Sequence, residues 1–216
     1  RGPILLTTVM PQAVCCLCAS PLLKVGAFWA CPTAACFARQ LKHAQWGRDS
    51  RGRPTELVYV PLPKQTVWHE AVYDPTVTRF LVGGAAGPGK STFERRTAYE
   101  FLGRVPGFHA LLLRKTHKDL DKSHVRFLQF EVPILGGEWK QGERIAVFKH
   151  SGNMDAILRT GHFEDPSAIE DYLSSEFDGI FIDEIVTLEE APTLELFTRA
   201  RSTNKTLFEL RGYAPD

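Results

Sequence analysis

Eight residues near the middle of the chain have the composition and spacing of a phosphate-binding loop. Residues 84–91 read Gly-Ala-Ala-Gly-Pro-Gly-Lys-Ser and fit the pattern G-x-x-x-x-G-K-[ST]. The glycines let consecutive backbone N–H groups curl around a polyphosphate without Cβ clashes. Lys90 would reach the β- and γ-phosphates, and the hydroxyl of Ser91 would hold Mg²⁺. The residues expected to contact ATP here are Gly84, Gly87, Gly89, Lys90, Ser91 and Thr92.

The flanking residues predict the strand and the helix that such a loop requires. Residues 79–83 are a short apolar run that ends in glycine, which predicts a buried strand. Residues 92–104 predict a helix whose apolar stripe includes Phe93 and Phe101. The positive N-terminal end of that helix would face the same anion. The alternative, a glycine-rich turn with a chance lysine, does not account for these flanks.

Two acids follow a second apolar run, residues 179–182. Carboxylates directly after a buried strand are costly unless a ligand needs them. Asp183 would hold Mg²⁺, usually through water, and Glu184 would orient or deprotonate the attacking water. Because ligands bind at the carboxyl ends of parallel strands, we expect both acids beside the phosphate loop. The alternative is the acidic first turn of a helix.

Further segments occur in an order typical of one motor family. Gln65, in Pro-Lys-Gln ahead of the phosphate loop, looks like an adenine-recognition glutamine. Residues 111–116 resemble a strand-plus-arginine element, and residues 177–184 resemble the family's acidic strand end. With the phosphate loop, residues 57–215 resemble the ATPase half of the large terminase subunit of tailed double-stranded DNA bacteriophages.

The resemblance implies a DNA-packaging motor. It would hydrolyse ATP to translocate double-stranded DNA into a procapsid in the host cytoplasm. Its partners would be the portal and the small terminase subunit, and it would act as a homo-oligomeric ring without a membrane. Two alternatives remain open: a helicase-like ATPase stimulated by nucleic acid, and a zinc-containing adaptor whose nucleotide-binding core is passive.

The chain departs from the family pattern at the arginine that many of these motors carry inside the phosphate loop. Alanines and a proline occupy the variable positions of the loop, so that charge must come from elsewhere. We expect Arg114 to stabilise the transition state, either within one chain or across a subunit boundary. The alternative residues for this role are Arg159, Arg199 and Arg201.

All five cysteines lie within residues 15–36. They include Cys-x-x-Cys, a gap of twelve residues, and then Cys-x-x-x-x-Cys, and four thiolates suit tetrahedral Zn²⁺. The apolar residues 22–30, broken at Gly26, predict a hairpin between the pairs. The predicted zinc ligands are Cys15, Cys18, Cys31 and Cys36. Cys16 or His43 could replace one of them, and buried reduced cysteines are the alternative to a metal.

Basic and acidic residues are distributed unequally along the chain. Of its 216 residues, the first 64 carry eight Lys and Arg against two acids, whereas the whole chain has a net charge of +1. A basic front segment suits contact with a polyanion, although a solvated basic linker fits equally well. Strands alternating with helices predict an α/β P-loop NTPase of the ASCE type with a mostly parallel sheet.

The predicted domain organisation has three parts. Residues 1–45 would form a zinc-ribbon-like unit, residues 46–60 a basic linker, and residues 61–216 the ATPase domain. The ATPase domain is expected to be truncated before the family's coupling motif and nuclease domain.

Overall fold

A computed structural model describes residues 9–16, 18–25, 28–83, 89–164 and 166–212. The chain divides into two compact units, Arg1–Gly84 and Ala85–Asp216. Gly84 and Gly87, on which the phosphate-loop prediction depends, lie outside the described residues.

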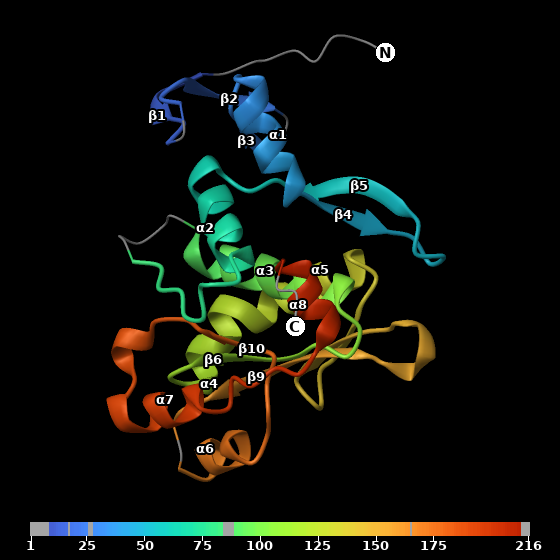
Figure 1. The fold of residues 1–216 in the computed structure, drawn as a ribbon, viewed down its shortest axis with the longest axis vertical. Coiled ribbons are helices and arrows are strands. Elements are labelled where there is room, and N and C mark those ends of the chain that lie inside the picture. The colour runs from blue at the N-terminus through green and yellow to red at the C-terminus, as the bar shows by residue number, and fades with distance from the viewer. Residues whose placement is uncertain (1–8, 17, 26–27, 84–88, 165, 213–216) are drawn as a thin grey trace. The chain divides into compact units, whose positions relative to one another are not determined.

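The first unit contains two small sheets and two helices (Figure 1). Strands β2 and β3 pair as the antiparallel hairpin predicted between the cysteine pairs. The side chain of Gln40 ties this region together, because its Oε1 accepts the N–H of Cys31 at 3.0 Å and its Nε2 donates to the carbonyl of Pro61 at 2.7 Å. The elements of this unit are β1 (Val9–Val14), β2 (Pro21–Val25), β3 (Phe28–Ala30), α1 (Ala34–Lys42), β4 (Gln45–Arg48), β5 (Pro54–Tyr59) and α2 (Pro63–Tyr73).

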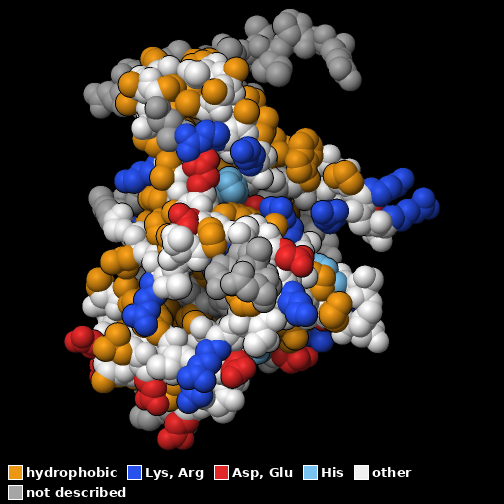
Figure 2. All heavy atoms as spheres, viewed as in Figure 1, with side chains coloured by type: hydrophobic (Ala, Val, Ile, Leu, Met, Phe, Trp, Pro, Cys, Tyr) orange, Lys and Arg blue, Asp and Glu red, His pale blue; other side chains and the backbone are white. Residues whose placement is uncertain are grey.

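Most of the segment predicted to be a basic linker, residues 46–60, pairs as the antiparallel hairpin of β4 and β5. Asp49 closes its turn by accepting the N–H groups of Arg51 and Arg53, each at 2.9 Å. The basic, glycine-containing segment between β4 and β5 is therefore a hairpin turn. In such turns, Asp and Asn side chains commonly accept hydrogen bonds from backbone N–H groups two residues later in the chain. Figure 2 shows Lys and Arg side chains gathered at the outer end of this hairpin.

The second unit is built on a five-stranded mixed sheet with the order β10-β6-β9-β8-β7. The pairs β10–β6 and β6–β9 are parallel, whereas β9–β8 and β8–β7 are antiparallel. The prediction of a mostly parallel sheet is thus only partly right, because β8, β9 and β7 form a meander. The strands are β6 (His109–Arg114), β7 (Glu138–Lys140), β8 (Ile145–Phe148), β9 (Ala156–His162) and β10 (Gly179–Ile182).

Helices lie on both sides of this sheet, α3 on one side and α6 and α7 on the other (Figure 1). Leu111 and Leu113 of β6 share a core with Tyr172 and Leu196, which come from α6 and α7. Burial on both faces explains why β6 reads as a continuous apolar run. The helical elements are α3 (Lys90–Arg104), α4 (His117–Leu120), η1 (Asp121–Val125), α5 (Arg126–Ile134), η2 (Ser151–Asn153), α6 (Pro166–Leu173), η3 (Ile185–Thr187), α7 (Glu190–Phe197) and α8 (Lys205–Leu210).

The helical stretch from His117 to Ile134 is interrupted by a π-helical segment, η1. Leu120, His124, Leu128 and Val132 recur every four residues across it, and all four are buried. A network around Glu131 of α5 ties this stretch to α3. Its carboxylate accepts Arg95 Nε, Arg96 Nη2 and Tyr99 Oη, each at 2.9 Å.

The strand predicted at residues 79–83 is absent, because this segment pairs with none of the described strands. Leu81 is 76% exposed, so the apolar run does not enter a core. A buried strand needs a neighbour to satisfy its backbone N–H and C=O groups. In the described part of the sheet, β10 is therefore an edge strand.

Candidate functional site

Helix α3 begins directly after the predicted phosphate loop. Gly89 immediately precedes it with a φ of 78°, a left-handed conformation that favours glycine. Lys90 is the first residue of the helix, and Ser91 follows in its first turn. The N-terminus of an α-helix directs its first backbone N–H groups outward, so this end of α3 is suited to bind an anion.

A hydrogen bond joins the two predicted nucleotide motifs. Ser91 Oγ donates to Asp183 Oδ2 at 3.1 Å, although the two residues are 92 positions apart. Asp183 follows β10, and its N–H extends the sheet ladder by donating to the carbonyl of Leu113 at 3.0 Å. The carboxyl ends of β6 and β10 and the start of α3 therefore meet at one place. A hydroxyl and a carboxylate in this arrangement are hard oxygen donors of the kind that Mg²⁺ prefers.

His124 and Glu94, which the sequence interpretation missed, complete this cluster. His124 Nε2 donates to Asp183 Oδ2 at 3.0 Å and lies 3.9 Å from Glu94 Oε2. The ligand atoms of Glu94, His124 and Asp183 all lie within 4.8 Å of one another. The sequence did contain a signal for both. Glu94 lies one helical turn after Ser91, and His124 interrupts the apolar four-residue repeat of its helix.

Burial governs the protonation of this cluster. Burial raises the pKa of Glu94 to about 8, and the charge of Asp183 adds to this effect. Burial also lowers the pKa of His124, so its imidazole is neutral at pH 7. For Asp183, burial is outweighed by the hydrogen bond from His124 and by nearby positive charge, and its pKa lies below the ordinary value. Asp183 is the ionised acid of the pair.

Arg114, at the end of β6, binds both acids of the strand end. Its Nη2 forms an ion pair with Glu184 Oε1, and its Nη1 lies 3.7 Å from Asp183 Oδ2. The side chain of Glu184 is 51% exposed, and its backbone has a φ of 57°. A left-handed conformation is uncommon outside glycine, and residues held in it cluster at functional sites. The ion pair therefore holds a water-accessible carboxylate beside the Ser91–Asp183 contact.

Other predicted residues have different surroundings. Gln65 belongs to the first unit, where its Oε1 accepts the N–H of Leu62 at 2.8 Å, and its contact with a nucleotide stays a prediction. Arg159 pairs with Asp171 at 3.1 Å. Arg199 lies just after α7, and its backbone carbonyl accepts the N–H of Phe177 at 2.9 Å. Of the candidate arginines, Arg114 is the one paired with the strand-end acids.

The cysteine cluster of the first unit has the composition of a structural zinc site. The Sγ atoms of Cys15, Cys18, Cys31 and Cys36 all lie within 4.8 Å of one another. Thiolates that share a tetrahedral Zn²⁺ at about 2.3 Å would be separated by a little under 4 Å, so the cluster fits the ion. Four cysteines would fill the coordination sphere and leave no open position for a substrate.

Neither alternative ligand belongs to this cluster. Cys16 is exposed, and the ring of His43 stacks on that of His69 with 4.9 Å between centroids. Hydrogen bonding with the Ser20 side chain lowers the pKa of Cys18 to about 5, whereas burial raises that of Cys36 to about 12. Zinc binding therefore has to displace protons from the more buried thiols.

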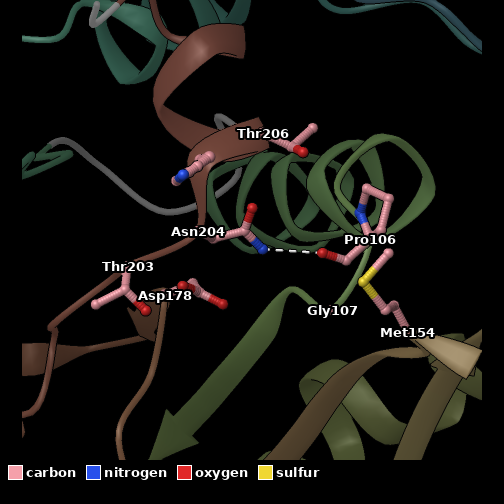
Figure 3. Close-up of a pocket in the computed structure, with 8 residues that line it drawn as sticks. Pro106, Gly107, Met154, Asp178, Thr203, Asn204 and Thr206 are labelled. Atoms are coloured by element: carbon pink, nitrogen blue, oxygen red, sulfur yellow. Dashed lines mark hydrogen bonds between the residues drawn. The ribbon is translucent and has the colours of Figure 1, made fainter. Parts of the chain in front are cut away.

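A shallow pocket lies at the other ends of the same strands (Figure 3). Pro106 and Gly107 precede β6, and Asp178 precedes β10. Its polar groups serve the fold: Asn204 donates to the carbonyl of Pro106 at 2.9 Å, and Asp178 accepts the N–H of His109 at 2.8 Å. Because ligands of such sheets bind at the carboxyl ends, the Ser91–Asp183 cluster is the better candidate site.

The site belongs to a mixed α/β unit with a hydroxyl–carboxylate cluster at its strand ends. No protein-family model matches the sequence, and no curated protein matches it. Among solved structures, the large terminase from a thermophilic bacteriophage aligns with a TM-score of 0.47 and 14% identity. The alignment covers 55% of this chain and 29% of that one. A similarity this low carries no argument about function, which rests on the residues themselves. None of the helices in the described part combines the length and apolar character needed to cross a bilayer.

Proposed function

We propose that the second unit is the ATP-hydrolysing motor domain of a DNA-packaging terminase. The observation that carries this proposal is the hydrogen bond from Ser91 to Asp183, which links a phosphate-loop sequence to an acidic strand end. The order of motifs along residues 57–215 supports the choice of motor family. In this proposal the partners are double-stranded DNA, a portal and a small terminase subunit, in a homo-oligomeric ring in the host cytoplasm.

In this proposal, the phosphate-loop residues and the two strand-end acids have separate roles in ATP hydrolysis. The backbone of the loop, including Gly84, Gly87 and Gly89, would cradle the phosphates, and Lys90 would neutralise them. Ser91 and Asp183 would hold Mg²⁺, which when bound supplies charge neutralisation to the phosphate oxygens. Glu184 would orient the attacking water and accept its proton. Thr92 and Gln65 would complete the contacts to the nucleotide.

Arg114 has a double role in this proposal. It holds Glu184 at the strand end, and it would also stabilise the charge that develops on the γ-phosphate. Reaching the phosphate requires it to release Glu184. The packaging motor would thereby couple movement of an arginine to release of the general base.

Turnover of ATP by two variants tests the proposal. Lys90→Ala should lower the rate by removing phosphate contacts, and Glu184→Gln should abolish turnover while ATP still binds. ATP hydrolysis and the binding of a fluorescent ATP analogue should be measured on the full chain. Glu138→Gln, which alters an exposed side chain of strand β7, is the matched control and should keep the wild-type rate. Wild-type turnover in both test variants would rule out the motor assignment.

The first unit supports a second, compatible function, because it is compact and carries its own cysteine cluster. We propose that zinc stabilises it as an adaptor that docks onto DNA or a packaging partner. Replacing Cys15 and Cys18 by serine should abolish partner binding while ATP turnover by the second unit continues. Loss of both activities together would argue against a separate adaptor. A helicase-like motor remains the alternative, and duplex-unwinding activity would favour it.

A further inference from the structure

Glu94 places a buried carboxylate oxygen where nothing in the described structure satisfies it. Its Oε2 is inaccessible to solvent and has no hydrogen-bond partner. It faces His124 Nε2 at 3.9 Å, next to the ionised Asp183. A carboxylate buried without a partner costs several kcal/mol, so it either keeps a proton or binds a cation. The geometry of its neighbours favours the cation.

His124 presents its Nε2 to the same point, and this nitrogen can bind a metal once the proton that it donates to Asp183 moves to Nδ1. The side chain is fully buried, and its Nδ1 has no hydrogen-bond partner among the described residues. Its polar contacts are therefore made through Nε2, the nitrogen that faces both carboxylates. The separations of 3.0 Å to Asp183 and 3.9 Å to Glu94 fall in the range expected for ligands that share one metal ion at about 2.1 Å.

We propose that Glu94, His124 and Asp183 form a binding site for a first-row transition-metal dication. The inference rests on the proposed function to the extent that Asp183 also belongs to the proposed nucleotide site. It goes further because it assigns Glu94 and His124 as ligands and names a class of metal. Ser91, whose Oγ is 3.1 Å from Asp183, would add a fourth oxygen.

The donor set determines the choice of metal. Mg²⁺ takes oxygen ligands and retains its waters, whereas an imidazole suits ions such as Mn²⁺, Fe²⁺ and Zn²⁺. The charge balance is also favourable, because two carboxylates face the site and the positive charge of Arg114 is shared with Glu184. The site is preassembled from two helices, α3 and η1, and the end of strand β10, so it would bind the ion without a nucleotide.

Mn²⁺ is the probe, because it is paramagnetic. Its resonance spectrum shows whether the ion is bound and whether a nitrogen atom coordinates it. The zinc-loaded full chain should be titrated with Mn²⁺ in the absence of nucleotide and followed by electron paramagnetic resonance. Wild type should bind one Mn²⁺ per chain at this site, with electron spin echo modulation from a directly bound ¹⁴N of imidazole. Glu94→Gln should weaken binding by about 10- to 100-fold, and His124→Asn should also abolish the nitrogen modulation.

Matched controls are available in the same unit. Glu138→Gln and His117→Asn alter exposed side chains and should leave Mn²⁺ binding unchanged. Circular dichroism establishes that each variant is folded, and the nearly isosteric Glu94→Gln keeps the test decisive if His124→Asn does not fold. Absence of Mn²⁺ binding by wild type, lack of nitrogen modulation, or wild-type affinity in Glu94→Gln would each overturn the proposal.

A parallel titration with a fluorescent ATP analogue separates this inference from the proposed function. If the nucleotide binds but Mn²⁺ shows no nitrogen ligand, the metal site is refuted and the motor proposal survives. If Mn²⁺ binds through His124 and no nucleotide binds, the metal site stands and the motor proposal fails.

Discussion

Asp183 accepts hydrogen bonds from two side chains that lie on different helices, Ser91 on α3 and His124 on η1. Its orientation is thus fixed from two directions before any ligand arrives. Fixed carboxylates of this kind require no reorganisation when charge develops nearby, which is how preorganised sites gain catalytic power. The orientation of Asp183 thus depends on hydrogen-bond donors that cannot be identified from the spacing of residues in the sequence.

Glu131 is the main electrostatic support behind this site, since it pairs with Arg95 and Arg96. Glu131→Gln would remove the buried carboxylate charge with which both guanidinium groups pair. We expect it to lower the free energy of unfolding by about 3 kcal/mol at pH 7, as measured by urea denaturation. Glu138→Gln, which alters an exposed carboxylate, should change stability by less than about 0.5 kcal/mol.

The same residue predicts a pH dependence. Burial raises the pKa of Glu131, but the charges of Arg96 and Arg95 outweigh burial and hold it below the ordinary 4.5. Because the folded-state pKa is depressed, the ionised form stabilises the fold above pH 4.5, and this contribution is lost as pH falls through the folded value. The stability difference between wild type and Glu131→Gln should therefore shrink between pH 5 and pH 2. A constant difference over that range would contradict the assignment.

Strand β9 depends on a glycine for its packing against α6. A Cβ added at Gly161 would lie 2.3 Å from Tyr172 Oη and 2.9 Å from Leu113 Cδ2. Gly161→Ala should destabilise the protein by about 2 kcal/mol, because neither neighbour can move freely in the core. Gly103→Ala on α3 is the control, since nothing lies within 4 Å of its added Cβ and alanine favours the helix by roughly 1 kcal/mol. Thermal unfolding of both variants should give shifts of opposite sign.

The elements that the sequence predicted well are those whose signal is local. The hairpin of β2 and β3, strand β10 and helix α3 were all expected within a residue or two of their observed bounds. Failures occurred where pairing decides the outcome. Residues 79–83 have the composition of a strand but pair with no strand in the described sheet. Strands β4 and β5 pair with each other, although their polar composition does not predict strands.

The candidate site was predicted in part for the same reason. Ser91, Asp183 and Glu184 belong to recognisable short patterns, and the structure brings the first two into contact. Glu94 and His124 belong to no pattern and enter the site because helix packing places them there. Gln65 also fits a short pattern. It belongs to the first unit, whereas Ser91 and Asp183 belong to the second, so its predicted contact with a nucleotide stays a prediction.

At the scale of the whole molecule, the two compact units should unfold separately when zinc is removed. The cysteine cluster supplies much of the core of its small region, with Leu22 and the partly buried Trp29 packed against it. Small metal-bound units have too little core to fold without their ion. Chelation should therefore abolish the thermal transition of the first unit and leave that of the second in place.

Tryptophan fluorescence can follow this transition, because Trp29, Trp46 and Trp68 lie in the first unit and Trp139 in the second. Chelation should shift most of the emission to longer wavelength. Cys16→Ser is the control and should retain one zinc per chain, since Cys16 is exposed and outside the cluster. A single transition that moves as a whole on chelation would show that the units do not unfold separately.

The left-handed backbone at Glu184 has an evolutionary consequence. A non-glycine residue in that conformation costs the fold about 1 kcal/mol, and glycine there would recover it. Selection for thermal robustness alone would therefore drive this position toward glycine and discard the carboxylate. Any lineage that keeps glutamate here accepts a weaker fold in exchange for an acid held at a fixed angle, and directed evolution for heat tolerance alone should lose that acid early.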